Sequence, residues 1–338
     1  MSADATFTMG AEEATIPAIG FGTFQPDHNP ESEVTKAVLQ AIEVGYRHID
    51  TAWMYGNGEA ERGVGEAIRR WNGKREELFI VTKLANAHHK PVDVAAGLEL
   101  SLQNLGLDYV DLYLMHSPVA YERVGHGESE WLTARSADGK PKIDFPTTQR
   151  YDLTWKAMEN LVQSGRAKHI GVSNFSVKKL RKVLRTCTIK PAVNQIELHP
   201  YLLETELMRF CHENDIHVTA FSPLGGKPVA AVAANPDVPG PLEHEVIISM
   251  AAKHRMSPAQ VLLKWGLQRG TSVIPKAYNP AHIADNFAVL AIPDLPKEDC
   301  IAIDEIKKEE GEVRFINYLE HWGFDIYNPG PEDPTEES

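Results

Sequence analysis

Apolar runs and amphipathic segments alternate along this chain at a regular spacing. Continuous apolar runs of about four to eight residues, bounded by turn residues, are typical of buried strands. Such runs lie at residues 17–22, 48–52, 78–84, 110–116, 169–173, 192–198, 218–223 and 272–275. Segments with the helical spacing of apolar positions separate and follow them, at residues 31–44, 59–71, 92–105, 153–164, 177–185, 204–213, 258–268 and 280–290. A short β-hairpin is expected before the first run, around residues 7–16.

This alternation predicts an α/β fold whose parallel strands form a barrel. Strands that are apolar throughout are buried on both faces, because helices cover the outside of a parallel sheet. Eight strand and helix units close a (β/α)8 barrel, or TIM barrel, and we expect a single such domain over residues 1–338. A doubly wound sheet is the alternative. It is disfavoured because no GxGxxG sequence follows the first predicted strand, where that fold places its phosphate loop.

Three irregular segments are expected to form long loops on the C-terminal face of the barrel, where barrel enzymes build their sites. They are residues 117–150, residues 225–241 and the tail from Gly311, which contains Arg314, Phe315, Trp322, Phe324 and Tyr327. The acidic end at 331–338 is expected to be disordered, because its composition offers little to bury.

Composition narrows the class of protein. The formal net charge is −13 and there is no strongly basic block, which disfavours nucleic-acid binding. The three cysteines, Cys187, Cys211 and Cys300, form no CxxC pair, so neither a disulfide framework nor a thiolate metal site is expected. No signal peptide and no apolar stretch of membrane-spanning length is visible. We expect a cytoplasmic protein that binds neither metal nor membrane and is a monomer.

Four titratable residues are predicted to meet at one rim of the barrel. Asp50, Lys83 and His116 stand near the C-terminal ends of the second, third and fourth predicted strands, and Tyr55 follows in the loop after Asp50. A buried carboxylate needs a cationic partner, which Lys83 can supply. An ammonium group beside a phenol lowers the pKa of the phenol, so Tyr55 is expected to serve as a general acid while His116 donates a hydrogen bond to a carbonyl oxygen. A structural ion pair, a packed tyrosine and a core histidine are the alternatives for these residues taken one by one.

Polar and aromatic residues at the later strand ends could bind a nicotinamide cofactor. Ser173, Asn174 and Gln195 can recognise a planar carboxamide, although capping of strand ends would explain them equally well. Phe221 could stack on a nicotinamide ring, and Lys276 with the helix that begins at Pro280 suits a phosphate. The full set of expected cofactor residues is Thr23, Ser173, Asn174, Gln195, Phe221, Ser222, Leu224, Lys276, Asn279, His282, Asp285 and Asn286. Phe24, Trp53 and Ser117 are expected to border the substrate.

These residues make the chain similar to the aldo-keto reductase superfamily from about Gly20 to Asn328. The matching blocks are residues 45–56, 78–84, 112–118, 171–175, 194–201, 221–225 and 274–286. The resemblance implies that Asp50, Tyr55, Lys83 and His116 form a catalytic tetrad and that Ser173, Asn174 and Gln195 hold the carboxamide of NADP(H). The tail at 315–327 looks most like that of fungal members that act on glyceraldehyde, dihydroxyacetone, glycerol or related sugars.

The chain departs from the pattern of this family at several positions. Phe221 stands where relatives usually have tyrosine, and Lys276, Ala277 and His282 replace a Lys-Ser pair and an arginine at the 2′-phosphate. We therefore expect only a moderate preference for NADP(H) over NAD(H). Ser117 and Ala85 occupy positions of two common tryptophans, which would give a larger or more polar pocket.

The resemblance implies a reductase of small hydroxy-aldehydes, ketones or sugars that also works in reverse as a polyol dehydrogenase. The alternative is a regulatory subunit that binds NADP(H) and turns over slowly. Consumption of NADPH in the presence of glyceraldehyde would distinguish the two.

Overall fold

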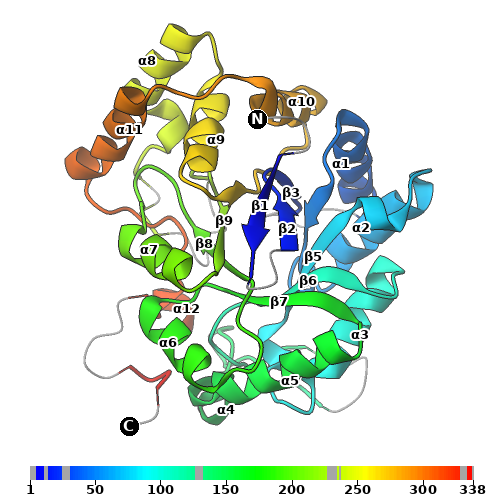
Figure 1. The fold of residues 1–338 in the computed structure, drawn as a ribbon. Coiled ribbons are helices and arrows are strands. Elements are labelled where there is room, and N and C mark those ends of the chain that lie inside the picture. The colour runs from blue at the N-terminus through cyan, green and yellow to red at the C-terminus, as the bar shows by residue number, and fades with distance from the viewer. Residues whose placement is uncertain are drawn as a thin grey trace.

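Eight parallel strands form a barrel that helices surround on the outside (Figure 1). The computed structural model describes residues 5–10, 14–24, 31–125, 132–226, 234–235, 237–327 and 333–336. The barrel strands are β3 (Gly20–Gly22), β4 (His48–Asp50), β5 (Phe79–Leu84), β6 (Val110–Met115), β7 (Ala167–Ser173), β8 (Val193–Glu197), β9 (His217–Phe221) and β10 (Ser272–Val273). They pair in chain order, as the apolar runs predict. The TIM-barrel fold predicted from the sequence is therefore confirmed.

The barrel closes between its first and last strands through only a few contacts. Ile19 and Val273 form an isolated parallel bridge, and the amide of Gly22 donates to the carbonyl oxygen of Pro275 at 3.1 Å. A side chain at Gly22 would clash here, because an added Cβ would lie 2.9 Å from the carbonyl oxygen of Ile274. This seam is therefore narrow and built largely from backbone.

Helices lie around the barrel, and most of them follow a strand and pack an apolar face against its outside. They are α1 (Glu31–Val44), α2 (Glu59–Arg70), α3 (Val94–Leu105), α4 (Phe145–Gln149), α5 (Tyr151–Gln163), α6 (Val177–Thr186), α7 (Thr205–Glu213), α8 (Glu245–His254), α9 (Pro258–Gln268), α10 (Pro280–Ala288), α11 (Lys297–Glu310) and α12 (Leu319–Trp322). Local sequence sets several of the helix starts. Ser257 and Gln260 form a capping box at α9, and the Asn279 side chain accepts a hydrogen bond from the amide of Ala281 at the start of α10.

The apolar periodicity of the sequence does not predict α4, α8, α11 or α12. The helices α8 and α11 pack against each other outside the regular strand and helix alternation. In α8 only Ile247 and Ala251 are buried, which leaves a weak periodic signal. The segment 117–150 is not wholly irregular either, because it contains α4 and antiparallel bridges such as Tyr121 with Ile143.

The predicted hairpin closes one end of the barrel. Its strands β1 (Thr6–Met9) and β2 (Ala14–Pro17) pair in antiparallel fashion. Met9 and Ile16 are buried against the barrel residues Leu112 and Val193. This hairpin covers the end from which the strands start, which leaves the C-terminal ends of the strands as the open face.

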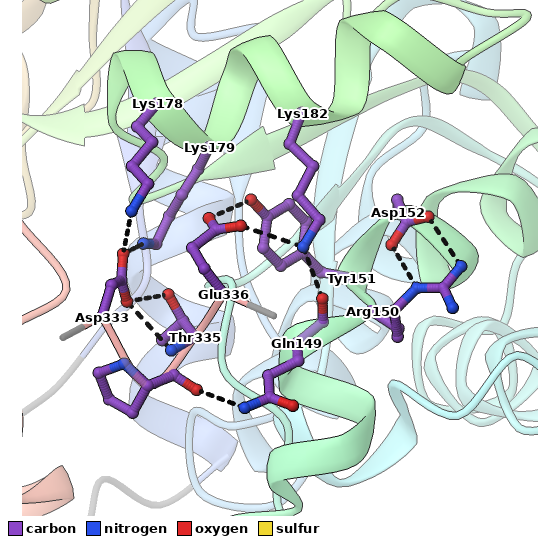
Figure 2. Close-up of polar contacts among 11 residues, drawn as sticks. Gln149, Arg150, Tyr151, Asp152, Lys178, Lys179, Lys182, Asp333, Thr335 and Glu336 are labelled. Carbon is purple, nitrogen blue, oxygen red and sulfur yellow. Dashed lines mark hydrogen bonds and ion pairs between the residues drawn. The ribbon is translucent and has the colours of Figure 1, made fainter. Parts of the chain in front are cut away.

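Residues 333–336, which lie within the stretch expected to be disordered, are bound to the surface of the barrel. Among the described residues 333–336, the carboxylate of Asp333 accepts hydrogen bonds from Lys178 and Lys179 of α6, and that of Glu336 accepts from Lys182 and Tyr151 (Figure 2). The acidic groups of this stretch meet a cationic helix face that is distant in sequence, a contact that composition does not reveal. We call residues 333–336 the C-terminal anchor.

In the part of the chain that the structure describes, no helix has both the length and the apolar character required to cross a membrane.

Several buried histidines are expected to make the fold sensitive to acid. Burial lowers the pKa of His48 and His88 to about 4, and that of His89 and His217 to about 3. In the unfolded chain these groups take up protons near pH 6.5, so the free energy of unfolding falls as the pH drops from about 6.5 toward about 4. Each group contributes at most about 1.4 kcal/mol per pH unit. Urea unfolding at pH 7, 6 and 5 measures the slope.

A pair of variants separates this effect from the titration of carboxylates. Replacing the buried His217 by glutamine should reduce the slope, whereas the same change at the exposed His212 should leave it unchanged. Equal free energies of unfolding at pH 7 and pH 5 would contradict the prediction.

Candidate active site

The four titratable residues expected at the rim lie together at the C-terminal ends of β4, β5 and β6. The buried Lys83 Nζ donates to Asp50 Oδ1 at 2.6 Å, to the carbonyl oxygen of Thr51 at 2.9 Å and to the hydroxyl of Tyr55 at 3.1 Å. The rings of Tyr55 and His116 lie edge to face with centroids 5.8 Å apart. Alternate residues of a strand point to the same side, and strands in register bring these groups from separate segments to one place.

The pKa of Tyr55 is shifted in the direction opposite to the one expected from the sequence. Burial, with a smaller contribution from the Asp50 carboxylate, raises the pKa of Tyr55 well above its usual value of 10. Burial also lowers the pKa of Lys83, which Asp50 opposes. The charge of Lys83 is largely balanced by Asp50, so its effect on the phenol does not outweigh burial. Tyr55 is therefore a protonated donor at neutral pH.

His116 is held as a neutral imidazole. Burial, and then the nearby Lys83, lowers the pKa of His116 well below 6.5. Among the described residues its Nδ1 atom has no hydrogen-bond partner. A neutral imidazole that faces a cavity can donate one N–H to a ligand without carrying a charge into the site.

Asp50, Tyr55 and His116 border a cavity of about 340 Å³. Some of the residues that line it are predicted site residues, and others are not predicted from the sequence. The lining residues are Gly22, Phe24, Asp50, Tyr55, His116, Ser173, Asn174, Gln195, Phe221, Ser222, Pro223, Leu224, Gly226, Leu242, Ile274, Pro275, Lys276, Ile316 and Tyr318. The aromatic residues of the tail are the sequence feature that points to Ile316 and Tyr318. They do not show that the tail lies over the cavity.

The tail reaches the cavity because a buried carboxylate fixes its backbone. Glu197, at the end of β8, accepts hydrogen bonds from the amides of Phe315 and Ile316 at 2.7 and 3.0 Å. Farther along, Trp322 stacks on Tyr318 with ring centroids 4.2 Å apart. The Trp322 indole also donates to the hydroxyl of Tyr121 in the long loop after β6. The tail thus lines the cavity through Ile316 and Tyr318, and the loop after β6 supports the tail.

The three expected carboxamide residues are joined to Asp50 and His116 by hydrogen bonds. Gln195 Nε2 donates to Asp50 Oδ2 at 2.7 Å, and Ser173 Oγ donates to the carbonyl oxygen of Gln195 at 2.8 Å. Asn174 adopts a left-handed conformation with φ 63° directly after β7. Its amide nitrogen donates to the carbonyl oxygen of His116 at 3.0 Å. All three line the cavity, with Phe221 and Ser222 beside them.

A second cavity of about 280 Å³ continues past Lys276 toward α9 and α10, and it also contains His282 and Asn286. Lys276, Leu224 and Leu242 border both cavities, which therefore adjoin. Asp285 lines the second cavity as well, but its carboxylate accepts hydrogen bonds from Ser257 and Gln260 of the α9 cap. Asp285 therefore helps to join two helices.

Besides the buried Lys83, four expected site residues lie outside the lining of either cavity. Thr23 is buried and donates to the carbonyl oxygen of Asp50, and Asn279 caps α10. Trp53 packs against His88. The hydroxyl of Ser117 is used by Asn86, which donates to it at 2.7 Å. These residues support neighbouring segments.

The paired cavities fit an extended cofactor with a carboxamide at one end and phosphates at the other. Amide and hydroxyl groups surround the first cavity, and Phe221 offers an aromatic face. The second cavity has the exposed Lys276 and His282 at its edge. Within the described ranges, no group of three or more metal-binding side chains occurs. The residues present therefore suit a phosphorylated dinucleotide.

Comparisons with known proteins give one consistent family. The model of the Aldo/keto reductase family matches residues 18–308. Glycerol 2-dehydrogenase (NADP(+)) of Hypocrea jecorina is 41% identical over 96% of this chain and 98% of that protein. Aldo-keto reductase family 1 member A1 of Mus musculus is 42% identical over 84% of each chain. The solved structure of the aldose reductase from Schistosoma japonicum superposes with a TM-score of 0.82, at 33% identity, over 97% of this chain and 99% of that one.

Proposed function

The chain belongs to the aldo/keto reductase family, and from that premise we propose that it reduces the carbonyl group of a small hydroxy-aldehyde, ketone or sugar with NADPH. It is an NADP-dependent oxidoreductase. The observation that carries the proposal is the hydrogen bond from Lys83 to the hydroxyl of Tyr55, at the wall of a cavity that also contains His116.

The proposed reaction needs a hydride and a proton. Bound NADPH supplies the hydride that the carbonyl carbon accepts. Tyr55 donates its hydroxyl proton to the carbonyl oxygen, and Lys83 stabilises the phenolate that remains. His116 donates a hydrogen bond to the same oxygen and orients the carbonyl. The product is the alcohol, and solvent returns a proton to Tyr55. Running the steps in reverse oxidises a polyol.

The proposed substrate class rests on a relative and on the shape of the site. The relative from Hypocrea jecorina is named a glycerol 2-dehydrogenase and matches almost the whole chain. Phe24 packs edge to face on Tyr55 with centroids 5.1 Å apart, and Tyr318 borders the same cavity. Aromatic walls beside the polar groups of Tyr55 and His116 suit a small molecule that approaches with its carbonyl toward Tyr55.

A panel of substrates tests the proposed function. Glyceraldehyde, dihydroxyacetone and aldoses would be assayed with NADPH, and glycerol and other polyols with NADP⁺, each alongside the cofactor without phosphate. We expect turnover in both directions with the smaller substrates. Tight binding of NADPH without turnover on any member of the panel would contradict the proposal.

The cofactor preference is expected to depend on Lys276 and His282. Replacing His282 by arginine should tighten NADPH binding by about tenfold at pH 8, because a charge-assisted hydrogen bond is worth ~1.5 kcal/mol or more and guanidinium stays charged. Fluorescence titrations of NADPH and NADH with the wild type and the variant measure this effect.

The same substitution at the exposed His212 of α7 adds an identical charge away from the cavities and serves as the control. If His282→Arg tightened NADH as much as NADPH, these residues would not form the 2′-phosphate site.

A further inference from the structure

A hydroxyl group from the tail contacts the carboxamide residues of the proposed cofactor site. Tyr327 donates a hydrogen bond from its hydroxyl to Asn174 Oδ1 at 2.9 Å. Asn174 lines the cavity, but Tyr327 does not. Tyr327 is therefore in a position to act on the cofactor site through Asn174.

The contact helps to fix which way the Asn174 amide faces. The amide nitrogen donates to the carbonyl oxygen of His116 at 3.0 Å and to Ser173 Oγ at 3.2 Å. A flipped amide would place Oδ1 against the carbonyl oxygen of His116, with no proton between the two atoms. In the observed orientation Tyr327 uses one lone pair of Oδ1, which leaves the second for an N–H donor on a ligand. Burial raises the pKa of Tyr327, which keeps its hydroxyl a donor.

Residues that precede and follow Tyr327 in the sequence restrict its position. The Arg314 guanidinium lies over its ring at 3.6 Å from the centroid and pairs with Glu204. On the other side, the C-terminal anchor begins six residues later. Six residues span at most about 20 Å, so a fixed anchor limits how far Tyr327 can move.

The anchor is built from buried as well as exposed groups. Lys179 Nζ is fully buried and donates to Asp333 Oδ2 at 3.2 Å, while Lys182 donates to Glu336 at 3.1 Å (Figure 2). Gln149 adds a hydrogen bond to the carbonyl oxygen of Pro334. A buried ammonium group without a partner is costly, so the anchor is expected to stay in place.

We propose that Tyr327 is a positioning residue for the carboxamide end of the cofactor, acting through the side-chain oxygen of Asn174, and that the C-terminal anchor restrains it there. This inference rests on the proposed function, because it takes the first cavity as the carboxamide site. It assigns a role in cofactor binding to the end of the chain.

The test uses ligands that differ only at the nicotinamide end. Tyr327→Phe in the full chain is expected to raise the Kd of NADPH by about threefold to tenfold, as for loss of one hydrogen bond. The Kd of 2′-phospho-ADP-ribose, which lacks the nicotinamide, should not change. The 3-acetylpyridine analogue of NADPH lacks the carboxamide N–H, so its Kd should change less than that of NADPH.

Two further variants sharpen the test. Tyr109→Phe removes the hydroxyl of a residue that directly precedes β6, away from Asn174, and it should leave all three Kd values unchanged. In an Asn174→Ala background, Tyr327→Phe should have no further effect on NADPH binding. Equal weakening of NADPH and 2′-phospho-ADP-ribose by Tyr327→Phe, or no change in either, would overturn the proposal.

Removal of residues 333–338 tests the anchor. We expect a lower melting temperature and a raised Kd for NADPH with an unchanged Kd for 2′-phospho-ADP-ribose. An unchanged Kd for NADPH would show that the anchor does not restrain Tyr327. Wild-type protein that binds NADPH but reduces no carbonyl would contradict the proposed function, whereas these Kd comparisons would still decide the role of Tyr327.

Discussion

Replacing Tyr55 by phenylalanine is expected to lower kcat for carbonyl reduction by about a hundredfold to ten-thousandfold, the usual contribution of a general acid. The substitution removes only the proton donor. The residues proposed to bind the carboxamide and the phosphates remain, so the Kd of NADPH should stay within about threefold of wild type. Steady-state rates with glyceraldehyde and fluorescence titration with NADPH measure the two quantities.

The control for this prediction is Tyr109→Phe. Tyr109 directly precedes β6, at the end of the barrel opposite the cavity, and its loss should leave kcat unchanged. If Tyr55→Phe kept activity within tenfold of wild type, another group would have to supply the proton, and the proposed role of Tyr55 would be wrong.

Replacing Lys83 by methionine is expected to reduce activity to a similar extent for a different reason. Without the ammonium group the phenolate form of Tyr55 loses its hydrogen bond and its charge partner. The change also leaves the buried Asp50 with Gln195 as its remaining side-chain donor. Breaking a buried ion pair in this way typically costs about 3–5 kcal/mol, so the free energy of unfolding should fall as well.

A double variant separates the loss of stability from the loss of catalysis. Adding Asp50→Asn to Lys83→Met removes the unpaired charge and should restore much of the stability, while kcat stays low. Urea unfolding and rate measurements on the two variants make the comparison. Recovery of activity together with stability would show that Lys83 matters only for folding, and a mere shift of the pH optimum in Lys83→Met would exclude its proposed role.

Much of the barrel could be predicted because each of its units carries a local signal. The helices α1 and α9 have the predicted bounds, and at α9 the apolar spacing coincides with a capping box. By contrast, α11 lies beyond the repeating units, and charged residues dominate its sequence. The anchor residues Asp333 and Glu336 meet lysines of α6 that are far away in the chain, and acidic composition alone indicated disorder.

The sequence predicts which residues form the candidate site better than it predicts the pKa of Tyr55. Strand ends and register brought Asp50, Lys83 and His116 together as expected. The effect of burial on the pKa of Tyr55 depends on the packing of Phe24 and the tail, which pattern and spacing do not reveal. Tyr318 was missed for the same reason, because its position depends on how Glu197 binds the tail backbone.

The narrow seam of the barrel has a consequence for how this chain folds during synthesis. Strand β3 is made early, but its neighbour β10 leaves the ribosome only near the end of translation. Until then, both outer strands of the sheet expose unpaired backbone groups, which favour association with other chains. Gly22, Ile274 and Pro275 border both the seam and the first cavity. A ligand in that cavity would contact both the first and the last strand of the barrel. Its binding would therefore stabilise the closed barrel relative to the open sheet.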